Sequence, residues 1–130
     1  MAFKIYSTDD NRVPGIEYLP ASAITPKVGM ALTQTTGQLA LAAGATAPTY
    51  ISMCEKDGKC TEGDIIPVIR VGKDMILETT FAADATSIKP GDKVTLQTGG
   101  LQVTATTTNG VAEVVYMDGT ASGSMCRVRF

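Results

Sequence analysis

The sequence contains no histidine and no tryptophan, and both absences narrow the functions open to it. Without histidine there is no Ser-His-Asp or Cys-His catalytic arrangement and no imidazole ligand for a metal ion. Aromatic residues make up only 5% of the chain, which argues against stacking surfaces for bases or sugars. Hydrophobic runs are also short, and none approaches the roughly 18 apolar residues that a membrane-spanning helix needs.

Charge is scarce as well. Charged residues are 18% of the chain, below the ~25% that is usual for soluble domains. The 11 Lys and Arg residues against 13 Asp and Glu give a net charge of -2, so the chain has no overall electrostatic reason to bind nucleic acid or an anionic membrane. The 130 residues suffice for one domain with a genuine core. Abundant threonine and glycine indicate a β-rich protein whose rather neutral surface suits coverage by partners.

Residues 1–27 differ in composition from the remainder. They hold three of the six prolines, Pro14, Pro20 and Pro26, and their apolar residues follow no period of 2 or 3.6. Because prolines favour extended backbone, we expect an extended N-terminal arm over 1–27 ahead of a domain over 28–130. This arm lies either on a neighbouring molecule or on its own domain, as an ordinary first strand and loop.

The arm carries apolar residues suited to anchoring it on another chain. The candidate anchors are Phe3, Tyr6, Ile16, Tyr18 and Leu19. No apolar segment long enough for a signal peptide precedes Asp9 and Asp10. We therefore expect synthesis in a cytoplasm, without export by a classical signal.

From Val28 onward, short apolar runs alternate with turn residues about every 8–12 residues, a pattern typical of an all-β sandwich or barrel. Pro67 lies inside one of these runs and indicates a sheet edge or a bulge. The only segments that suggest a helix are too short and poorly capped, so we predict an all-β fold. The strands predicted in this region cover 28–32, 38–42, 49–54, 65–71 and 75–81.

The last third of the chain predicts strand pairing in detail. Gly99-Gly100 is a two-residue turn of the primed type between strands over 93–98 and 101–106. This turn places Leu96 opposite Val103 on a largely apolar face. The hydrophobic pattern gives the same register independently of the turn.

Two further signals complete this region. Asn109-Gly110 forms a second turn of this kind, which sets Ala105 opposite Val114. The C-terminal residues then alternate in polarity, which predicts a last strand built into a sheet. Its inward-facing side chains are Cys126, Val128 and Phe130.

The most specific local feature is the segment between Cys54 and Cys60. A three-residue loop over 56–58 would place these cysteines opposite each other, at a spacing that permits a disulfide. The alternative is two reduced thiols near a hairpin tip, as is usual for a protein made in a cytoplasm. A metal site is disfavoured, because two thiolates without histidine leave zinc coordination incomplete. Cys126 makes the number of cysteines odd, which argues against a secreted disulfide framework.

No spacing of carboxylates demands a catalytic pair, and we predict no enzymatic activity, no cofactor and no metal. Asp64, Asp92 and Asp118 each adjoin a glycine at a predicted turn, where an Asp side chain caps the backbone. Arg127 and Arg129 share one face of the last strand, either as a solvated face or as a site for an anion or an acidic partner. The other carboxylates considered are Asp9, Asp10, Glu62, Glu78 and Glu113.

Several turn-and-strand pieces follow one another in an order found in one family of proteins. The later pieces are GDKVTL at 91–96, GLQVT at 100–104, NGVAEV at 109–114 and CRVRF at 126–130. The earlier pieces are VGMAL at 28–32, GQL at 37–39, PTYIS at 48–52 and GDIIPV at 63–68. In this order they resemble the small capsid decoration proteins of tailed bacteriophages, also called cement proteins. The resemblance covers residues 28–130.

The resemblance implies a compact β-barrel or sandwich, often trimeric, that sits on the outside of an assembled head and clamps capsomers together. It implies a virion protein synthesised in the host cytoplasm, whose partners are the major capsid protein and further copies of itself as a homotrimer. Neither nucleic acid nor a membrane is an expected partner. On this view the five candidate anchors contact the capsid or a neighbouring subunit. The alternatives are another phage structural subunit, such as a tail-tube or head-completion protein, or a small β-barrel ligand-binding domain.

Overall fold

The computed structural model describes residues 2–8 and 14–130, and these residues form ten strands and no helix. The prediction of an all-β fold is therefore confirmed. The strands are β1 (Lys4–Ser7), β2 (Ile16–Pro20), β3 (Ala31–Thr35), β4 (Gln38–Leu41), β5 (Tyr50–Ser52), β6 (Ile65–Arg70), β7 (Ile76–Thr80), β8 (Lys93–Val94), β9 (Ala112–Met117) and β10 (Met125–Arg129).

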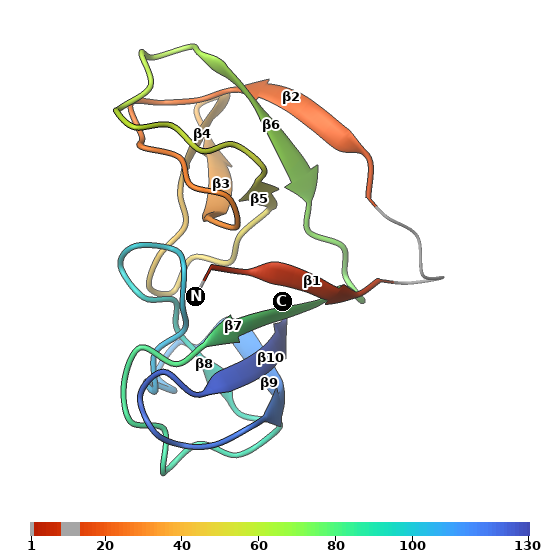
Figure 1. The fold of residues 1–130 in the computed structure, drawn as a ribbon, viewed down its shortest axis with the longest axis vertical. Coiled ribbons are helices and arrows are strands. Elements are labelled where there is room, and N and C mark those ends of the chain that lie inside the picture. The colour runs from red at the N-terminus through yellow and green to blue at the C-terminus, as the bar shows by residue number, and fades with distance from the viewer. Residues whose placement is uncertain (1, 9–13) are drawn as a thin grey trace.

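The strands form two five-stranded antiparallel sheets that pack together as a sandwich and do not close into a barrel. The first sheet has the order β1-β7-β10-β9-β8, and the second has the order β2-β6-β5-β3-β4. Figure 1 shows the second sheet above the first, with β1 at the boundary between them. The chain therefore enters the first sheet with β1, crosses to build the second sheet, and returns to complete the first.

Two hydrophobic clusters lie on the two faces of the second sheet. The larger cluster fills the space between the sheets and includes Ile51, Ile69 and Val128. The smaller cluster lies on the far face of the second sheet and includes Tyr50 and Val68. Successive residues of a strand point to opposite faces, so β5 and β6 are apolar on both sides. This explains why these strands read as continuous apolar runs instead of alternating ones.

The described part of the N-terminal segment belongs to the domain itself. β1 pairs with β7 at the edge of the first sheet, and β2 pairs with β6 at the edge of the second. Phe3 is 2% exposed within the larger cluster, and its ring lies edge-on to Phe130 with 5.9 Å between centroids. Ala21 is buried in the smaller cluster. A boundary at residue 27 therefore does not separate an arm from the core.

Gly29 determines how closely β1 approaches the second sheet. The Phe3 N–H donates to the Gly29 carbonyl at 3.0 Å. Gly29 has a φ of +83°, and a Cβ at this position would collide with the Phe3 carbonyl and the Ala2 side chain. Both the backbone conformation and the close approach require glycine here.

The predicted register around Gly99-Gly100 is confirmed, but the turn differs. Leu96 pairs with Val103 as predicted. The Gly100 N–H donates to the Gln97 carbonyl at 2.9 Å, so the chain turns one residue earlier than a two-residue hairpin would. Leu101 packs against the smaller cluster, and this contact draws the tip of the hairpin away from the regular geometry.

The second predicted pairing, Ala105 with Val114, is wrong. β9 pairs with β8 instead, in a register that puts Val94 opposite Ala112. The other neighbour of β9 is β10. Gly110 permits this arrangement because it lies directly against the backbone of β8, where a Cβ would collide.

Two other predictions have opposite outcomes. In β10, Cys126 and Val128 are buried in alternation with more exposed neighbours, as predicted. Pro67, in contrast, does not lie at a sheet edge, since β6 has β2 and β5 as neighbours. The Pro67 carbonyl accepts a hydrogen bond from the Met53 N–H at 3.0 Å. This contact follows directly after the last β5–β6 pair, Ser52 with Val68. The nitrogen of Pro67 therefore faces the end of β5, where the missing donor removes one hydrogen bond from the last pair of that ladder.

Candidate docking surface

Large apolar side chains that remain exposed gather at one end of the inner face of the second sheet, the face turned toward the first sheet. Six of the nine such side chains in the described residues lie there or beside it, each 36–67% exposed. We call this surface the open face. Its members are Ile5, Ile16, Tyr18, Val28, Met53 and Ile65.

Strand pairing places these side chains on a common surface. Tyr18 lies opposite Pro67, and Ile16 lies opposite Ile69. Ile69 belongs to the cluster between the sheets, so Ile16 and Tyr18 point to the same inner face. Met53 follows β5, and its N–H donates to the Pro67 carbonyl. A row of side chains from Tyr18 to Met53 therefore crosses three adjacent segments of the sheet.

Ile65 and Val28 extend the open face beyond this row. Ile65 begins β6 and pairs with the last residue of β2. Val28 precedes Gly29, whose N–H donates to the Ser52 carbonyl at 2.8 Å, on the side of β5 that faces β3. Between this end and β1 lies an apolar hollow of about 150 Å³. Its lining includes Phe3, Ile5, Val28, Ile51, Met53 and Ile69.

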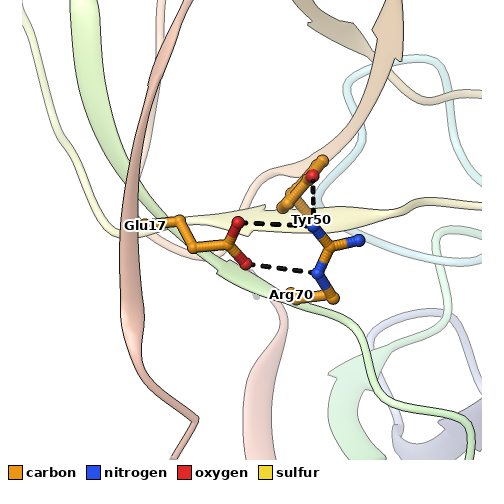
Figure 2. Close-up of polar contacts among 3 residues, drawn as sticks. All are labelled: Glu17, Tyr50 and Arg70. Carbon is orange, nitrogen blue, oxygen red and sulfur yellow. Dashed lines mark hydrogen bonds and ion pairs between the residues drawn. The ribbon is translucent and has the colours of Figure 1, made fainter.

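A polar cluster on the far face holds β2 against the sheet. Figure 2 shows the Arg70 guanidinium between the Glu17 carboxylate and the Tyr50 hydroxyl. Arg70 Nε and Nη2 donate to the two Glu17 oxygens at 3.2 and 3.3 Å, and Nη2 also donates to Tyr50 at 2.9 Å. The hydrogen bond with Glu17 raises the pKa of Arg70. With Glu17 paired on the far face, β2 presents Ile16 and Tyr18 on the inner face.

Tyr6 lies elsewhere, on the outer face of the first sheet. The guanidinium carbon of Arg127 is 3.7 Å from the Tyr6 ring centroid and 4.6 Å from that of Tyr116. Arg127 Nε donates to Glu78 at 3.2 Å, and Lys4 Nζ approaches the same carboxylate at 3.2 Å. Hydrogen bonds from Lys4 and then Arg127 hold the pKa of Glu78 below its usual range. Arg127 is therefore engaged within the protein instead of forming a free solvated face.

The structure separates the five candidate anchors. Ile16 and Tyr18 are exposed side by side on the open face, and Tyr6 is exposed on the other sheet. Leu19 is partly buried against the smaller cluster, and Phe3 is buried in the larger one. The Phe3 ring packs in the core of its own domain, and its contact with another chain stays a prediction.

Four residues of the open face, Ile5, Val28, Met53 and Ile65, are not distinguished by sequence reasoning. Met53 and Ile65 fall inside predicted strands, where apolar residues are expected to be buried. A strand that is apolar on both sides, as 65–70 is, indicates coverage on both faces. Which end stays uncovered depends on where the other sheet packs, and no local signal reports that.

The predicted hairpin between Cys54 and Cys60 is wrong. No strand covers residues 53–64, all of which the structure describes. The Cys60 N–H donates instead to the Ile24 carbonyl at 2.7 Å, so this loop pairs with the segment before β3. Both cysteines are free thiols at the smaller cluster, and burial raises the pKa of Cys60. A disulfide between them stays a prediction.

Asp64 and Asp92 have the capping role predicted for them. Asp64 accepts from the Thr61 N–H at 2.8 Å, and this hydrogen bond is the main cause of its lowered pKa. Asp92 accepts from the Lys89 N–H at 2.9 Å. Across residues 2–8 and 14–130, no group of three or more His, Cys, Asp or Glu side chains is placed to hold a metal ion. Asp9 and Asp10, for which we predict no catalytic role, lie outside the described residues.

No protein-family model, curated protein or solved structure matches this chain. In the part of the chain that the structure describes, no helix has the length and apolar character needed to cross a membrane. The open face remains the structural feature with the clearest bearing on function.

Proposed function

We propose that this chain is a capsid decoration protein of a tailed bacteriophage, a non-enzymatic component of the virion exterior. In this role it binds the assembled head and clamps capsomers together. The order of turn-and-strand pieces over 28–130 supports this proposal, and so does the all-β sandwich, which is a fold the resemblance implies. Its partners on the head are the major capsid protein and further copies of itself, as a homotrimer, after synthesis in the host cytoplasm.

The open face is the observation that carries the proposal. Tyr18 and Ile65 are 67% and 60% exposed, and they project from strands that are paired along their length. Burying one large apolar side chain stabilises a complex by roughly 1.5–3 kcal/mol. Because their strands are already ordered, binding has to order only the side chains, at a cost of about 0.5–1.5 kcal/mol each. Several of them together suffice to hold a small subunit on a lattice.

The test is addition of the purified protein to undecorated, expanded heads of the phage that encodes it, followed by imaging. We expect decoration of the outer surface by the wild-type protein. The double variant Ile16→Ser, Tyr18→Ser should bind at least tenfold more weakly, because it loses two buried apolar contacts. Bare heads after incubation with the wild-type protein would contradict the proposed function.

Tyr116→Ser is the matched control for this experiment. Tyr116 is an exposed tyrosine like Tyr18, but it lies beside Arg127 on the outer face of the first sheet. This variant should decorate heads as the wild-type protein does. If the double variant at residues 16 and 18 also binds normally, the attachment surface is not the open face.

A further inference from the structure

The smaller cluster, on the far face of the second sheet, is covered by loops, whereas the larger cluster lies between two sheets. Its members outside the strands lie in three connecting segments, 21–30, 53–64 and 95–111. Ile24, Cys60 and Leu101 each represent one of these segments in the cluster. A core covered by separate loops is open to solvent wherever two loops leave a gap.

One such gap lies between the 21–30 and 95–111 segments and the end of β4. It is a mostly apolar hollow of about 320 Å³, which we call the far-face hollow. Ile24 and Leu101 line it from the two loops, and Leu41 lines it from β4. Leu41 is two residues from the buried Leu39 of the smaller cluster, so its side chain points to the same far face. Met30 is a further part of the wall and is buried in the smaller cluster, so the hollow reaches this second core.

Backbone hydrogen bonds hold the walls of the far-face hollow in place. The Ala31 N–H donates to the Gly100 carbonyl at 2.7 Å, which ties the 95–111 segment to the start of β3. The Ile24 carbonyl accepts from the Cys60 N–H at 2.7 Å, which ties the 21–30 segment to the 53–64 loop. A ligand therefore meets a site that is already formed, as is usual for small-molecule pockets.

Lys27 is the one charged residue among the described residues that line the far-face hollow. Its side chain is exposed and has no ion-pair partner within residues 2–8 and 14–130. The remaining described members of the lining are Thr25 and Gly99. The described lining thus holds no carboxylate that would repel an anion, and the Lys27 ammonium group attracts one.

The size of the far-face hollow favours a small ligand over a protein partner. Its volume of about 320 Å³ is at the lower end of the range for small-molecule sites, roughly 300–1,000 Å³. Among its described lining residues, Leu41 is the one large apolar side chain that is substantially exposed, at 37%. A standard protein interface needs about 800 Å² on each partner, which one exposed leucine does not provide. The hollow instead suits a narrow apolar chain.

We propose that the far-face hollow binds a free alkyl carboxylate, an unbranched apolar chain that ends in one carboxylate group. The chain lies against Ile24, Met30 and Leu101, and the carboxylate lies next to the Lys27 ammonium group. Burial of the chain supplies most of the affinity, because each methylene group removed from water adds to it. The charge pair is exposed to solvent and adds a smaller, salt-dependent share. This binding leaves the open face free and does not depend on the proposed function.

Titration of the full chain with decanoate, followed by NMR of its methyl groups, tests this site. We expect saturable binding with a Kd below about 1 mM and shifts at Ile24, Leu41 and Leu101. The methyl signals of Ile16 and Ile65 on the open face should move much less. Absence of saturable binding overturns the proposal, and so do shifts at the open face as large as those in the hollow.

Matched variants separate the charged part of the site from the apolar part. Lys27→Gln should weaken decanoate binding about two- to fivefold and leave the binding of uncharged decanol unchanged. Lys59→Gln removes an exposed lysine of the 53–64 loop and should change neither ligand. Leu41→Ser should weaken both ligands about threefold or more, whereas Ile65→Ser makes a similar change on the open face and should weaken neither. Equal effects of the two lysine variants, or of the two serine variants, overturn the proposal.

Thermal unfolding checks that each variant is folded, as we expect because all four substituted side chains are exposed. Vesicles of phosphatidylglycerol test the other source of the same chemistry, an anionic lipid in a membrane. A concave site accepts one free chain and not the flat surface of a bilayer, so the protein should not co-sediment with vesicles. Co-sedimentation without decanoate binding would assign the hollow to a membrane surface and overturn the proposal.

Discussion

Phe3 joins the two ends of the chain in one core. Its ring packs against Phe130, and its N–H bonds to Gly29. The residue also lines the hollow at the open face. A single side chain near the N-terminus therefore links the first strand, the second sheet and the last residue.

Replacement of Phe3 by alanine should lower the free energy of unfolding by about 3–5 kcal/mol, because it leaves a cavity between the sheets. Tyr6→Ala is the control, since the Tyr6 ring is about half exposed on the outer face, and it should destabilise the protein by much less. Urea unfolding measures both changes. Equal losses would show that residue 3 is not part of the core.

The three cysteines should differ in reactivity toward iodoacetamide in the folded protein. Cys126 is fully buried between the sheets, and burial raises the pKa of its thiol to about 12. Cys60 is buried and Cys54 is partly exposed. Mass spectrometry at mildly alkaline pH should show Cys54 labelled first, Cys60 slowly and Cys126 only after unfolding, since the thiolate is the reactive form. Early labelling of Cys126 would contradict its burial.

At the scale of elements, β1 and β2 form one edge of each sheet. β1 pairs with β7, and Lys4 bonds Glu78 across that pair. β2 pairs with β6, and Glu17 bonds Arg70 across that pair. Both strands therefore have backbone and side-chain links to their neighbours, which an arm lying loosely on the surface would lack.

A chain that begins at Lys27 should lose its cooperative thermal transition. The deletion removes one edge strand of each sheet together with three buried residues, Phe3, Ala21 and Pro26, and each loss exposes core. The double variant Ile16→Ser, Tyr18→Ser is the control, because it keeps both strands and changes only exposed side chains. Circular dichroism during heating measures the transition. A cooperative transition in the shortened chain would show that residues 28–130 fold alone.

At the scale of the whole molecule, carboxylates join strands that are distant in the sequence. Glu78 on β7 bonds Lys4 on β1 and Arg127 on β10. Glu113 on β9 bonds Arg129 on β10 at 2.8 Å. These hydrogen bonds lower the pKa of both glutamates. Four of the five strands of the first sheet are thus linked through ionised carboxylates.

Stability should therefore fall in acid. A carboxylate whose pKa is lower in the folded state stabilises fully above its unfolded pKa, near 4.3 for glutamate. That contribution is lost as the pH falls through the folded pKa. We expect a constant Tm near neutral pH and a decline below about pH 4.5. Glu78→Gln should start from a lower Tm and show a shallower decline.

Asp57→Asn is the control for the acid series. Asp57 is exposed in the 53–64 loop and forms no ion pair with any described residue. Its replacement should leave the dependence of Tm on pH unchanged. If Glu78→Gln follows the wild-type curve at every pH, the Lys4 and Arg127 contacts contribute nothing to stability.

The sequence by itself determined the features that depend on neighbouring residues. A period of two placed Cys126 and Val128 in the core, and glycines beside apolar runs set the register of Leu96 with Val103. The position of Asp64 beside a glycine at a turn likewise predicted that its side chain caps the backbone. Each of these follows from backbone geometry over a few residues, so a local pattern is sufficient to predict it.

Only the tertiary structure decided which elements meet and which apolar residues stay exposed. β9 pairs with β8 instead of the segment at 101–106. The loop that contains Cys60 packs against the far face of the second sheet. Ile65 and Ile66 are identical neighbours, yet Ile65 is exposed and Ile66 is buried. The smaller cluster covers Ile66 on the far face, whereas the first sheet leaves Ile65 uncovered on the inner face. Burial depends on what packs over a side chain, and that partner lies far away in the sequence.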